Sequence, residues 1–200
     1  MPPIARRPAR LGVLISGGGR TMVNLHRACA EGRVPATIGV VAASRECPGC
    51  DRARELALPV EVLSGVLDEA SFLRLLTQHD IDLVVLAGFL KLVPVPPGWV
   101  GRVLNIHPAL LPAFGGKGLY GKRVHEAVLA SGVRESGCTV HVADAIYDHG
   151  PIVLQRRCPV LPGDTPETLA ARVFEQELEA YPEAVRLVIE RGFAWSTDRA

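Results

Sequence analysis

The sequence predicts an α/β protein with a doubly wound, mostly parallel sheet and helices on both of its faces. Short apolar runs alternate with stretches of helical period through the first half of the chain, which is the pattern of repeated βαβ units. Residues 81–88, with the sequence IDLVVLAG, are almost all apolar, as in a strand that is covered on both faces. The first half is therefore expected to be Rossmann-like, with any ligand at the carboxyl ends of its strands.

Local signals place each element of the first half. Met22, Leu25 and Cys29 lie on one face of a helix that begins near Thr21, and Asp68 is suited to cap another helix. The expected strands are residues 11–15, 37–43, 60–63, 81–88 and 102–106. The expected helices are residues 21–31, 51–58 and 68–79.

The second half is less regular. A helix is expected over residues 122–130, a strand with one exposed face over 138–143 and a further strand over 152–157. Residues 164–167 (DTPE) combine a capping residue, a first-turn proline and an acid, so they predict the start of a long helix. That helix is expected to break or kink near Pro182, because proline lacks the N–H that an interior turn needs.

Length and charge limit the domain organisation and the partners. The 200 residues are enough for one domain, expected over residues 11–192, between an N-terminal extension (1–10) and a C-terminal tail (193–200). The chain has 22 Lys and Arg against 21 Asp and Glu, a net charge of +1, which gives no electrostatic signal for nucleic acid or an anionic membrane. No apolar run approaches the roughly 18 residues of a membrane-spanning helix. We therefore expect small-molecule partners, with no nucleic acid and no membrane.

Five cysteines, an odd number in a chain of this length, favour a reducing compartment, and the N-terminus lacks the apolar core of a secretory signal. A cytoplasmic location is the expectation. Cys47 and Cys50 form a single C-x-x-C segment without the second pair that a zinc site requires. We interpret Cys47-Pro48-Gly49-Cys50 as a Pro-Gly turn; the alternative is a thioredoxin-like redox motif, which would open a helix directly after a strand.

A glycine-rich loop, Ser16–Thr21, connects the first expected strand to the first expected helix. Adjacent glycines let backbone N–H groups approach an anion, and the start of the helix adds partial positive charge. The third glycine of a dinucleotide fingerprint would fall at Met22, so the loop suits a single phosphate group better than a pyrophosphate. A tight turn without a ligand explains the same residues equally well.

A second segment, Asn105-Ile106-His107-Pro108, lies at the end of an expected strand. Asn105 and His107 are two residues apart, so both side chains point to one face. An amide that donates to an oxyanion, beside an imidazole that moves a proton, is suited to acyl-type transfer. A carboxylate from residues 144–151, such as Asp148, would raise the pKa of His107 and orient it. The alternatives are a strand-end histidine bound to a carbonyl and an ordinary turn at Asp148.

Several segments together resemble the phosphoribosylglycinamide formyltransferases, a family of folate-dependent enzymes of purine synthesis. The resemblance covers most of the chain between residues 11 and 192, and the Asn-x-His…Asp set is shared by folate-type formyltransferases. The matching segments are residues 14–19, 85–89, 104–108 with 110–112, 147–151 and 164–172.

This resemblance implies a formyltransferase fold and a defined reaction. A formyl group would pass from 10-formyltetrahydrofolate, a co-substrate, to the amino group of phosphoribosylglycinamide through a tetrahedral intermediate. Asn105 would stabilise the oxyanion, His107 would be the general acid, and Asp148 would keep His107 protonated and in place. The resemblance implies no metal, and a monomer or a homodimer.

The resemblance also implies where each substrate binds. The substrate phosphate would bind at Gly19, Arg20 and Thr21, and its ribose would bind at Glu177. The folate would bind along Leu90, Lys91, Leu92 and Val93, together with Asn105.

Two departures from the family pattern leave roles open. Arg20 stands where the family usually has a serine, and it either adds charge to the phosphate site or points to solvent. Residues 114–121 form a longer, glycine-dense loop that is either a lid or an insertion. Three other functions compete: another folate-type formyl enzyme such as formyltetrahydrofolate hydrolase, a non-catalytic phosphate- or nucleotide-binding module, and a nicotinamide-dependent oxidoreductase.

Overall fold

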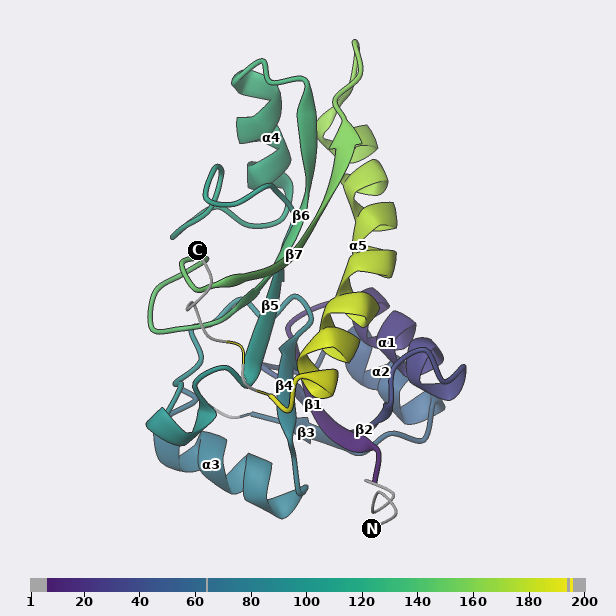
Figure 1. Ribbon diagram of the computed structural model, residues 1–200, viewed down its shortest axis with the longest axis vertical. Coiled ribbons are helices and arrows are strands. Elements are labelled where there is room, and N and C mark those ends of the chain that lie inside the picture. The colour runs from purple at the N-terminus through teal and green to yellow at the C-terminus, as the bar shows by residue number, and fades with distance from the viewer. Residues whose placement is uncertain (1–6, 64, 194, 196–200) are drawn as a thin grey trace.

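The computed structural model describes residues 7–63, 65–193 and 195, and within them the chain forms a seven-stranded sheet (Figure 1). The strands are β1 (Ala9–Ile15), β2 (Ala36–Ala43), β3 (Val60–Val62), β4 (Leu83–Leu86), β5 (Val103–His107), β6 (Glu135–Val142) and β7 (Ile152–Pro159). Their order in the sheet is β3-β2-β1-β4-β5-β6-β7. β1 to β5 are parallel, whereas β6 and β7 are antiparallel to their neighbours, so the predicted mostly parallel sheet is confirmed.

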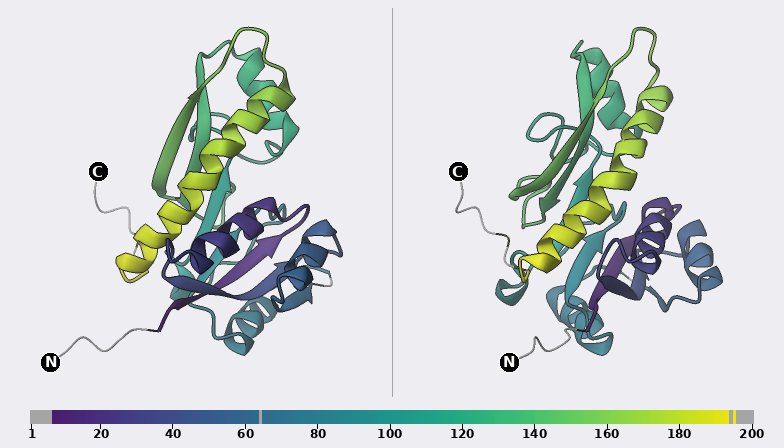
Figure 2. Two further views of the ribbon diagram at one scale, coloured as in Figure 1. Left: turned by 90° about the vertical axis from the view of Figure 1, so that its right-hand side faces the viewer. Right: turned by 45° about the vertical axis from the view of Figure 1, so that its right-hand side comes forward.

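Helices cover both faces of this sheet, as predicted. They are α1 (Arg20–Ala30), α2 (Pro48–Glu55), α3 (Glu69–Gln78), α4 (Lys122–Ala130) and α5 (Pro166–Glu190), with a 3-10 turn, η1 (Pro97–Trp99). α1, α2 and α5 lie on one face and α3 lies on the other (Figure 2). Val13 and Ile15 of β1 belong to the core beneath α1 and α5, while Leu14 packs with Phe72 of α3. Alternate residues of one strand thus enter two separate cores.

α5 is one continuous helix through Pro182, so of the predicted break or kink, the break is wrong. Proline has no N–H to donate to the carbonyl four residues earlier, which here belongs to Leu178. The side chain of Asn24, from α1, donates to that carbonyl oxygen at 2.8 Å. A neighbouring helix therefore satisfies the acceptor that Pro182 leaves free, and α5 continues.

The C-x-x-C segment opens α2, so its interpretation as an isolated Pro-Gly turn is wrong. Cys47 is the N-cap residue and Pro48 is the first helical residue. Proline is favourable at that position because its missing N–H has no partner in the first turn. The helix begins three residues before the predicted Asp51, shortly after the end of β2.

The prediction of one exposed face for residues 138–143 is also wrong. Residues 136–142 of β6 are buried on both faces. Cys138 and Val140 pack in the core with α5, and Thr139 and His141 face a buried polar network. Polar residues at alternate positions were here a sign of internal hydrogen bonds rather than of contact with water.

The structure describes the two ends of the chain only in part. Residues 1–6 and 196–200, parts of the expected extension and tail, lie outside the described residues. β1 begins at Ala9, within the expected extension of residues 1–10. Among the described residues, no helix has the length and apolar character needed to cross a membrane.

Candidate active site

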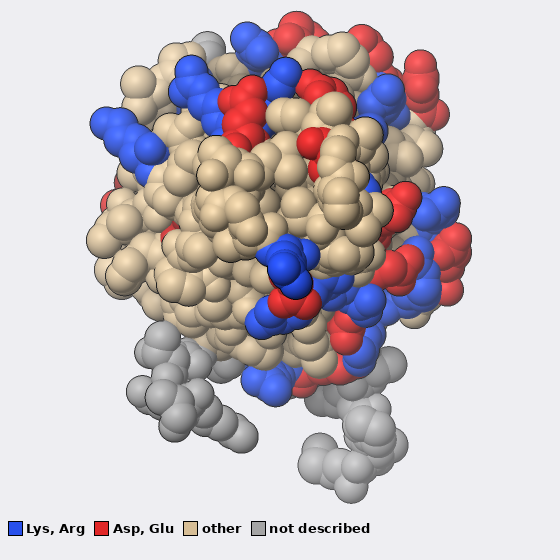
Figure 3. Space-filling view, turned by 90° about the horizontal axis from the view of Figure 1, so that it is seen from above, with Lys and Arg blue, Asp and Glu red and all other residues tan. Residues whose placement is uncertain are grey.

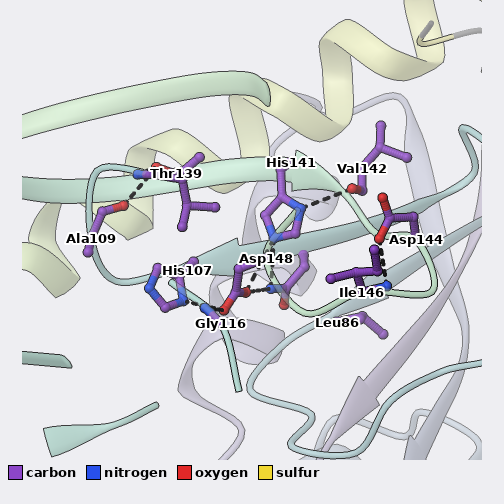
Figure 4. Close-up of polar contacts among 12 residues, drawn as sticks. Leu86, His107, Ala109, Gly116, Thr139, His141, Val142, Asp144, Ile146 and Asp148 are labelled. Atoms are coloured by element: carbon purple, nitrogen blue, oxygen red, sulfur yellow. Dashed lines mark hydrogen bonds and ion pairs between the residues drawn. The ribbon is translucent and has the colours of Figure 1, made fainter. Parts of the chain in front are cut away.

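The candidate site lies where β5 ends and the loop between β6 and β7 returns to it (Figure 4). Asn105 and His107 are alternate residues of β5, and Pro108 follows the end of the strand. Asp148 comes from the loop of residues 143–151, with a left-handed backbone (φ 55°) that aspartate tolerates better than most residues. The antiparallel pairing of β5 with β6 brings these distant parts of the chain together.

Asp148 is the centre of a hydrogen-bond network. Its Oδ2 lies 3.4 Å from Nδ1 of His107 and accepts a hydrogen bond from the N–H of Gly116 at 3.0 Å. Its Oδ1 accepts from Nδ2 of Asn105 at 3.3 Å. The structure therefore brings Asp148 to Asn105 and His107, an approach that no spacing in the sequence predicts.

Burial changes the ionisation of this pair. Desolvation lowers the pKa of His107, which is 3% exposed, and this outweighs the opposite effect of the Asp148 carboxylate. The expectation that Asp148 leaves His107 with a raised pKa is therefore wrong in its net direction. Burial also acts to raise the pKa of Asp148, but the neighbouring rings of His141 and His107 and the Gly116 N–H bring that pKa below its ordinary value.

The second ring nitrogen of His107 has its own partner. Nε2 lies 2.8 Å from the carbonyl oxygen of Phe114. A carbonyl only accepts, so Nε2 carries the hydrogen, and the neutral ring presents a lone pair at Nδ1 to Asp148. Protonation of Nδ1 turns that contact into an ion pair. His107 is thus a strand-end histidine bound to a carbonyl, and its other ring nitrogen faces a carboxylate.

His141 is a member of the network that the sequence reasoning missed. It is opposite Asn105 in the register of β5 and β6, and it is 1% exposed. Its Nδ1 lies 2.9 Å from the carbonyl of Val142, so Nδ1 carries the hydrogen and Nε2 accepts from Nδ2 of Asn105 at 3.0 Å. A histidine in a strand was the available signal, but its partner depended on the strand pairing.

Thr139, also missed, holds the chain that follows His107. Its hydroxyl donates to the carbonyl of Ala109 at 2.7 Å and accepts from the N–H of Leu111 at 3.0 Å. Gln155 of β7 donates to the same hydroxyl at 2.9 Å. These bonds satisfy buried backbone groups just past the strand end, where a loop would otherwise leave them without partners.

A cavity of about 520 Å³ opens in front of the network. His107 and Asp148 form part of its wall, and Thr21 and Glu177 form another part. The glycine-dense loop of residues 116–121 completes the lining. The cavity thus joins the candidate catalytic residues to one of the three predicted phosphate-binding residues and to the predicted ribose-binding acid.

Arg20 does not line this cavity. Its guanidinium lies over the ring of Phe174, 3.9 Å from the ring centre, and lines a separate groove with Arg27 and Arg52. Gly19, with a left-handed backbone, is the N-cap of α1 and is likewise absent from the lining of the large cavity. Of the predicted phosphate-binding residues, only Thr21 lines it.

Glu177 has an unusual ionisation. Burial raises its pKa to about 7, and the charge of Arg20 opposes that shift. Its carboxyl group therefore changes charge near neutral pH while lining the large cavity. A carboxylate in this position accepts hydrogen bonds from hydroxyl groups.

A second, smaller cavity of about 50 Å³ also adjoins the network, at Asn105, His141 and Asp148. Of the predicted folate-binding segment, Lys91, Leu92 and Val93 line this cavity, and Leu90 lines the large one. The N–H of Leu90 donates to Oγ of Ser16 at 3.1 Å, which ties this segment to the glycine loop. Four residues line both cavities: Phe89, Asn105, Tyr147 and Asp148.

The charges near the surface do not form one extended patch on the face seen from above. Basic and acidic side chains are interspersed there, with uncharged areas between them (Figure 3). Within the part of the chain that the structure describes, no group of three or more His, Cys, Asp or Glu side chains is placed to hold a metal ion.

Comparisons with known proteins identify the family of the chain. The family model "Formyl transferase" matches residues 9–185. The chain is 41% identical over 202 residues to phosphoribosylglycinamide formyltransferase, chloroplastic, of Arabidopsis thaliana, covering 96% of this chain and 69% of that protein. It is 37% identical to the human trifunctional purine biosynthetic protein adenosine-3, covering 92% of this chain and 18% of that protein.

One solved structure is similar to this chain in both fold and sequence. The crystal structure of glycinamide ribonucleotide transformylase 1 from Symbiobacterium toebii superimposes with a TM-score of 0.83 at 38% identity, covering 92% of this chain and 89% of that one. The family model spans the network and both cavities. The chain belongs to the formyl transferase family.

Proposed function

We propose that this protein transfers the formyl group of 10-formyltetrahydrofolate to the amino group of phosphoribosylglycinamide. One observation carries the proposal: Asn105 and Asp148 line two cavities. A group-transfer enzyme needs residues shared by a donor site and an acceptor site, because the two substrates must meet at one atom. The names of the similar proteins from Arabidopsis and from Symbiobacterium support the choice of acceptor.

In the large cavity, the phosphate of the acceptor is assigned to Thr21 at the start of α1, and its ribose to Glu177. The helix N-terminus supplies N–H groups and partial positive charge for the phosphate. The ionised carboxylate of Glu177 accepts from ribose hydroxyls. We therefore assign the amino group to the part of the wall formed by His107 and Asn105.

The small cavity is assigned to the pterin of the donor. Leu86, Phe89 and Val93 are buried apolar residues of its wall, which suits a flat ring. Its volume of about 50 Å³ is well below the ~300 Å³ of a typical small-molecule site. We therefore expect the exposed side chains of Leu92 and Tyr147 to move outward when the folate binds.

The chemistry then proceeds where the two cavities share residues. The amine nitrogen bonds to the formyl carbon, and the bond from that carbon to the folate nitrogen breaks. Nδ2 of Asn105 donates to the oxyanion, exchanging one of its present bonds to His141 and Asp148. His107 gives a proton to the leaving nitrogen, and the proton lost by the amine balances it. The hydrogen on Nε2 of His107 is bound to the carbonyl of Phe114. Movement of the loop that follows Phe114 therefore affects the delivery of this proton.

The test is an absorbance assay of the deformylation of a 10-formylfolate analogue, with and without phosphoribosylglycinamide. We expect turnover only when the phosphorylated amine is present. Equal turnover without the amine would identify a hydrolase instead. Binding of both compounds without turnover would identify a non-catalytic binding module.

A further inference from the structure

Outside the active site, the structure brings two thiols together at the start of α2. Cys47 is the N-cap of the helix and Cys50 lies one turn later, with their Sγ atoms 3.7 Å apart. A disulfide bond requires about 2.05 Å between the sulfur atoms, so a side-chain movement of less than ~2 Å closes the gap. Neither thiol has a role in the proposed formyl transfer.

The two thiols are chemically different. Cys47 is half-buried at the N-terminus of α2, so it is the more accessible of the two thiols. Cys50 is buried, its Sγ lies 3.8 Å from the carbonyl of Arg45, and burial raises its pKa. An accessible attacking thiol followed by a buried resolving thiol is the arrangement that disulfide exchange uses.

The residues between the thiols touch the glycine loop. The N–H of Gly49 donates to the carbonyl of Gly17 at 3.0 Å. A Cβ on Gly49 would lie 2.6 Å from that oxygen, and a Cβ on Gly19 would lie 2.8 Å from Cα of Gly49. The Arg52 side chain, one turn further along α2, donates to the carbonyl of Gly18. Backbone therefore packs directly on backbone, and a shift of one segment displaces the other.

We propose that Cys47 and Cys50 are a modification site that forms a reversible disulfide with low-molecular-weight disulfides as oxidants, and that the disulfide weakens binding of the phosphorylated substrate. Cys47 Sγ, as thiolate, attacks one sulfur of the oxidant and releases the first thiol. Cys50 Sγ then attacks Cys47 Sγ and releases the second. Two protein thiols are oxidised, the oxidant is reduced to two thiols, and those thiols take up the two protons. The effect on binding rests on the proposed function, whereas the chemistry of the thiols does not.

The chemical half is tested on the full chain incubated in mixtures of oxidised and reduced glutathione, quenched with acid, alkylated and mapped by mass spectrometry. We expect a Cys47–Cys50 disulfide that reduced glutathione reverses. Cys50→Ser should stop at a mixed disulfide of glutathione on Cys47, and Cys47→Ser should remain unmodified at Cys50. The half-buried Cys29, whose pKa burial raises to about 11, is the internal control and should stay reduced. Absence of the disulfide at every ratio, or equal reaction at Cys29, would overturn the proposal.

The coupling half is tested by steady-state kinetics of the reduced and oxidised protein. Oxidation should raise the KM for phosphoribosylglycinamide several-fold and change the KM for the folate much less, because the folate segment is tied to the glycine loop only through Ser16. The Cys47→Ser, Cys50→Ser double variant should show neither change under the same oxidant. A disulfide that forms without altering the KM would refute the coupling. If the protein proved to have no formyl transfer activity, the peptide map would still decide whether the modification site exists.

Discussion

Asn105 and His141 face each other across β5 and β6, with Nδ2 of the amide 3.0 Å from Nε2 of the ring. The carbonyl of Val142 fixes the hydrogen of His141 on Nδ1, which leaves Nε2 as an acceptor. The second hydrogen on Nδ2 of Asn105 is directed to Asp148. His141 therefore orients the amide that the proposed reaction uses to bind an oxyanion, although it lines only the small cavity.

Replacing His141 should impair the reaction through Asn105. His141→Leu removes the acceptor, and loss of one such hydrogen bond, about 1 kcal/mol, corresponds to a roughly fivefold to tenfold lower kcat. His141→Gln offers an amide oxygen at a similar distance and should recover part of the rate. His26→Leu, on α1 away from both cavities, is the control. Equal rates for the two His141 variants would contradict an orienting role.

The carboxylate of Asp148 should matter for rate more than for binding. Asp148→Asn keeps a residue that tolerates the left-handed backbone but removes the charge that faces His107. Since general acid–base groups contribute about 10²–10⁴-fold, kcat should fall by that order while both KM values change little. Asp80→Asn is a matched control, because Asp80 has a similar backbone (φ 50°) and is exposed. Near-normal kcat in Asp148→Asn would refute the assigned role.

The two neighbours Arg20 and Thr21 should behave differently. Thr21 lines the large cavity at the start of α1, so Thr21→Glu places a negative charge where the phosphate is assigned. Loss of a charged hydrogen bond, about 1.5–3 kcal/mol, corresponds to a roughly tenfold to 100-fold higher KM for phosphoribosylglycinamide. Arg20→Ala should change that KM much less, because its side chain stacks on Phe174. The reverse order in steady-state kinetics would place the phosphate beside Arg20.

The buried state of His107 should appear in the pH dependence of stability. Its folded pKa lies below the ordinary value of 6.5, so below that pH the unfolded chain takes up a proton that the folded chain does not. The free energy of unfolding should therefore fall as the pH drops from about 7.5 to about 5.5, by at most ~1.4 kcal/mol per pH unit for this group. Urea unfolding should show a shallower fall in His107→Asn. His125, also buried with a lowered pKa, contributes in the same direction in both proteins. Identical slopes would mean that His107 titrates normally in the fold.

Most of the fold can be predicted from the sequence, because most of its helices and strands depend on local patterns. The apolar run of β4 and the capping residues Asp68 and Thr165 each act within a few residues. The errors depend on contacts between distant segments. Pro182 does not break α5, because the side chain of Asn24 donates the hydrogen bond that the missing N–H of Pro182 would have given to the carbonyl of Leu178.

The candidate site shows the same division. Asn105 and His107 share a face because they are two apart on one strand, and period alone predicts that. The approach of Asp148, the role of His141 and the net lowering of the pKa of His107 require the pairing of β5 with β6 and the resulting burial. No local pattern in the sequence contains that information.

The most direct test of the account identifies the product. The full chain is incubated with 10-formyltetrahydrofolate and phosphoribosylglycinamide, and both products are quantified by mass spectrometry. The arrangement of two cavities around Asn105 and Asp148 predicts one molecule of N-formylated phosphoribosylglycinamide for each folate deformylated. Free formate in place of the formylated amine would contradict it.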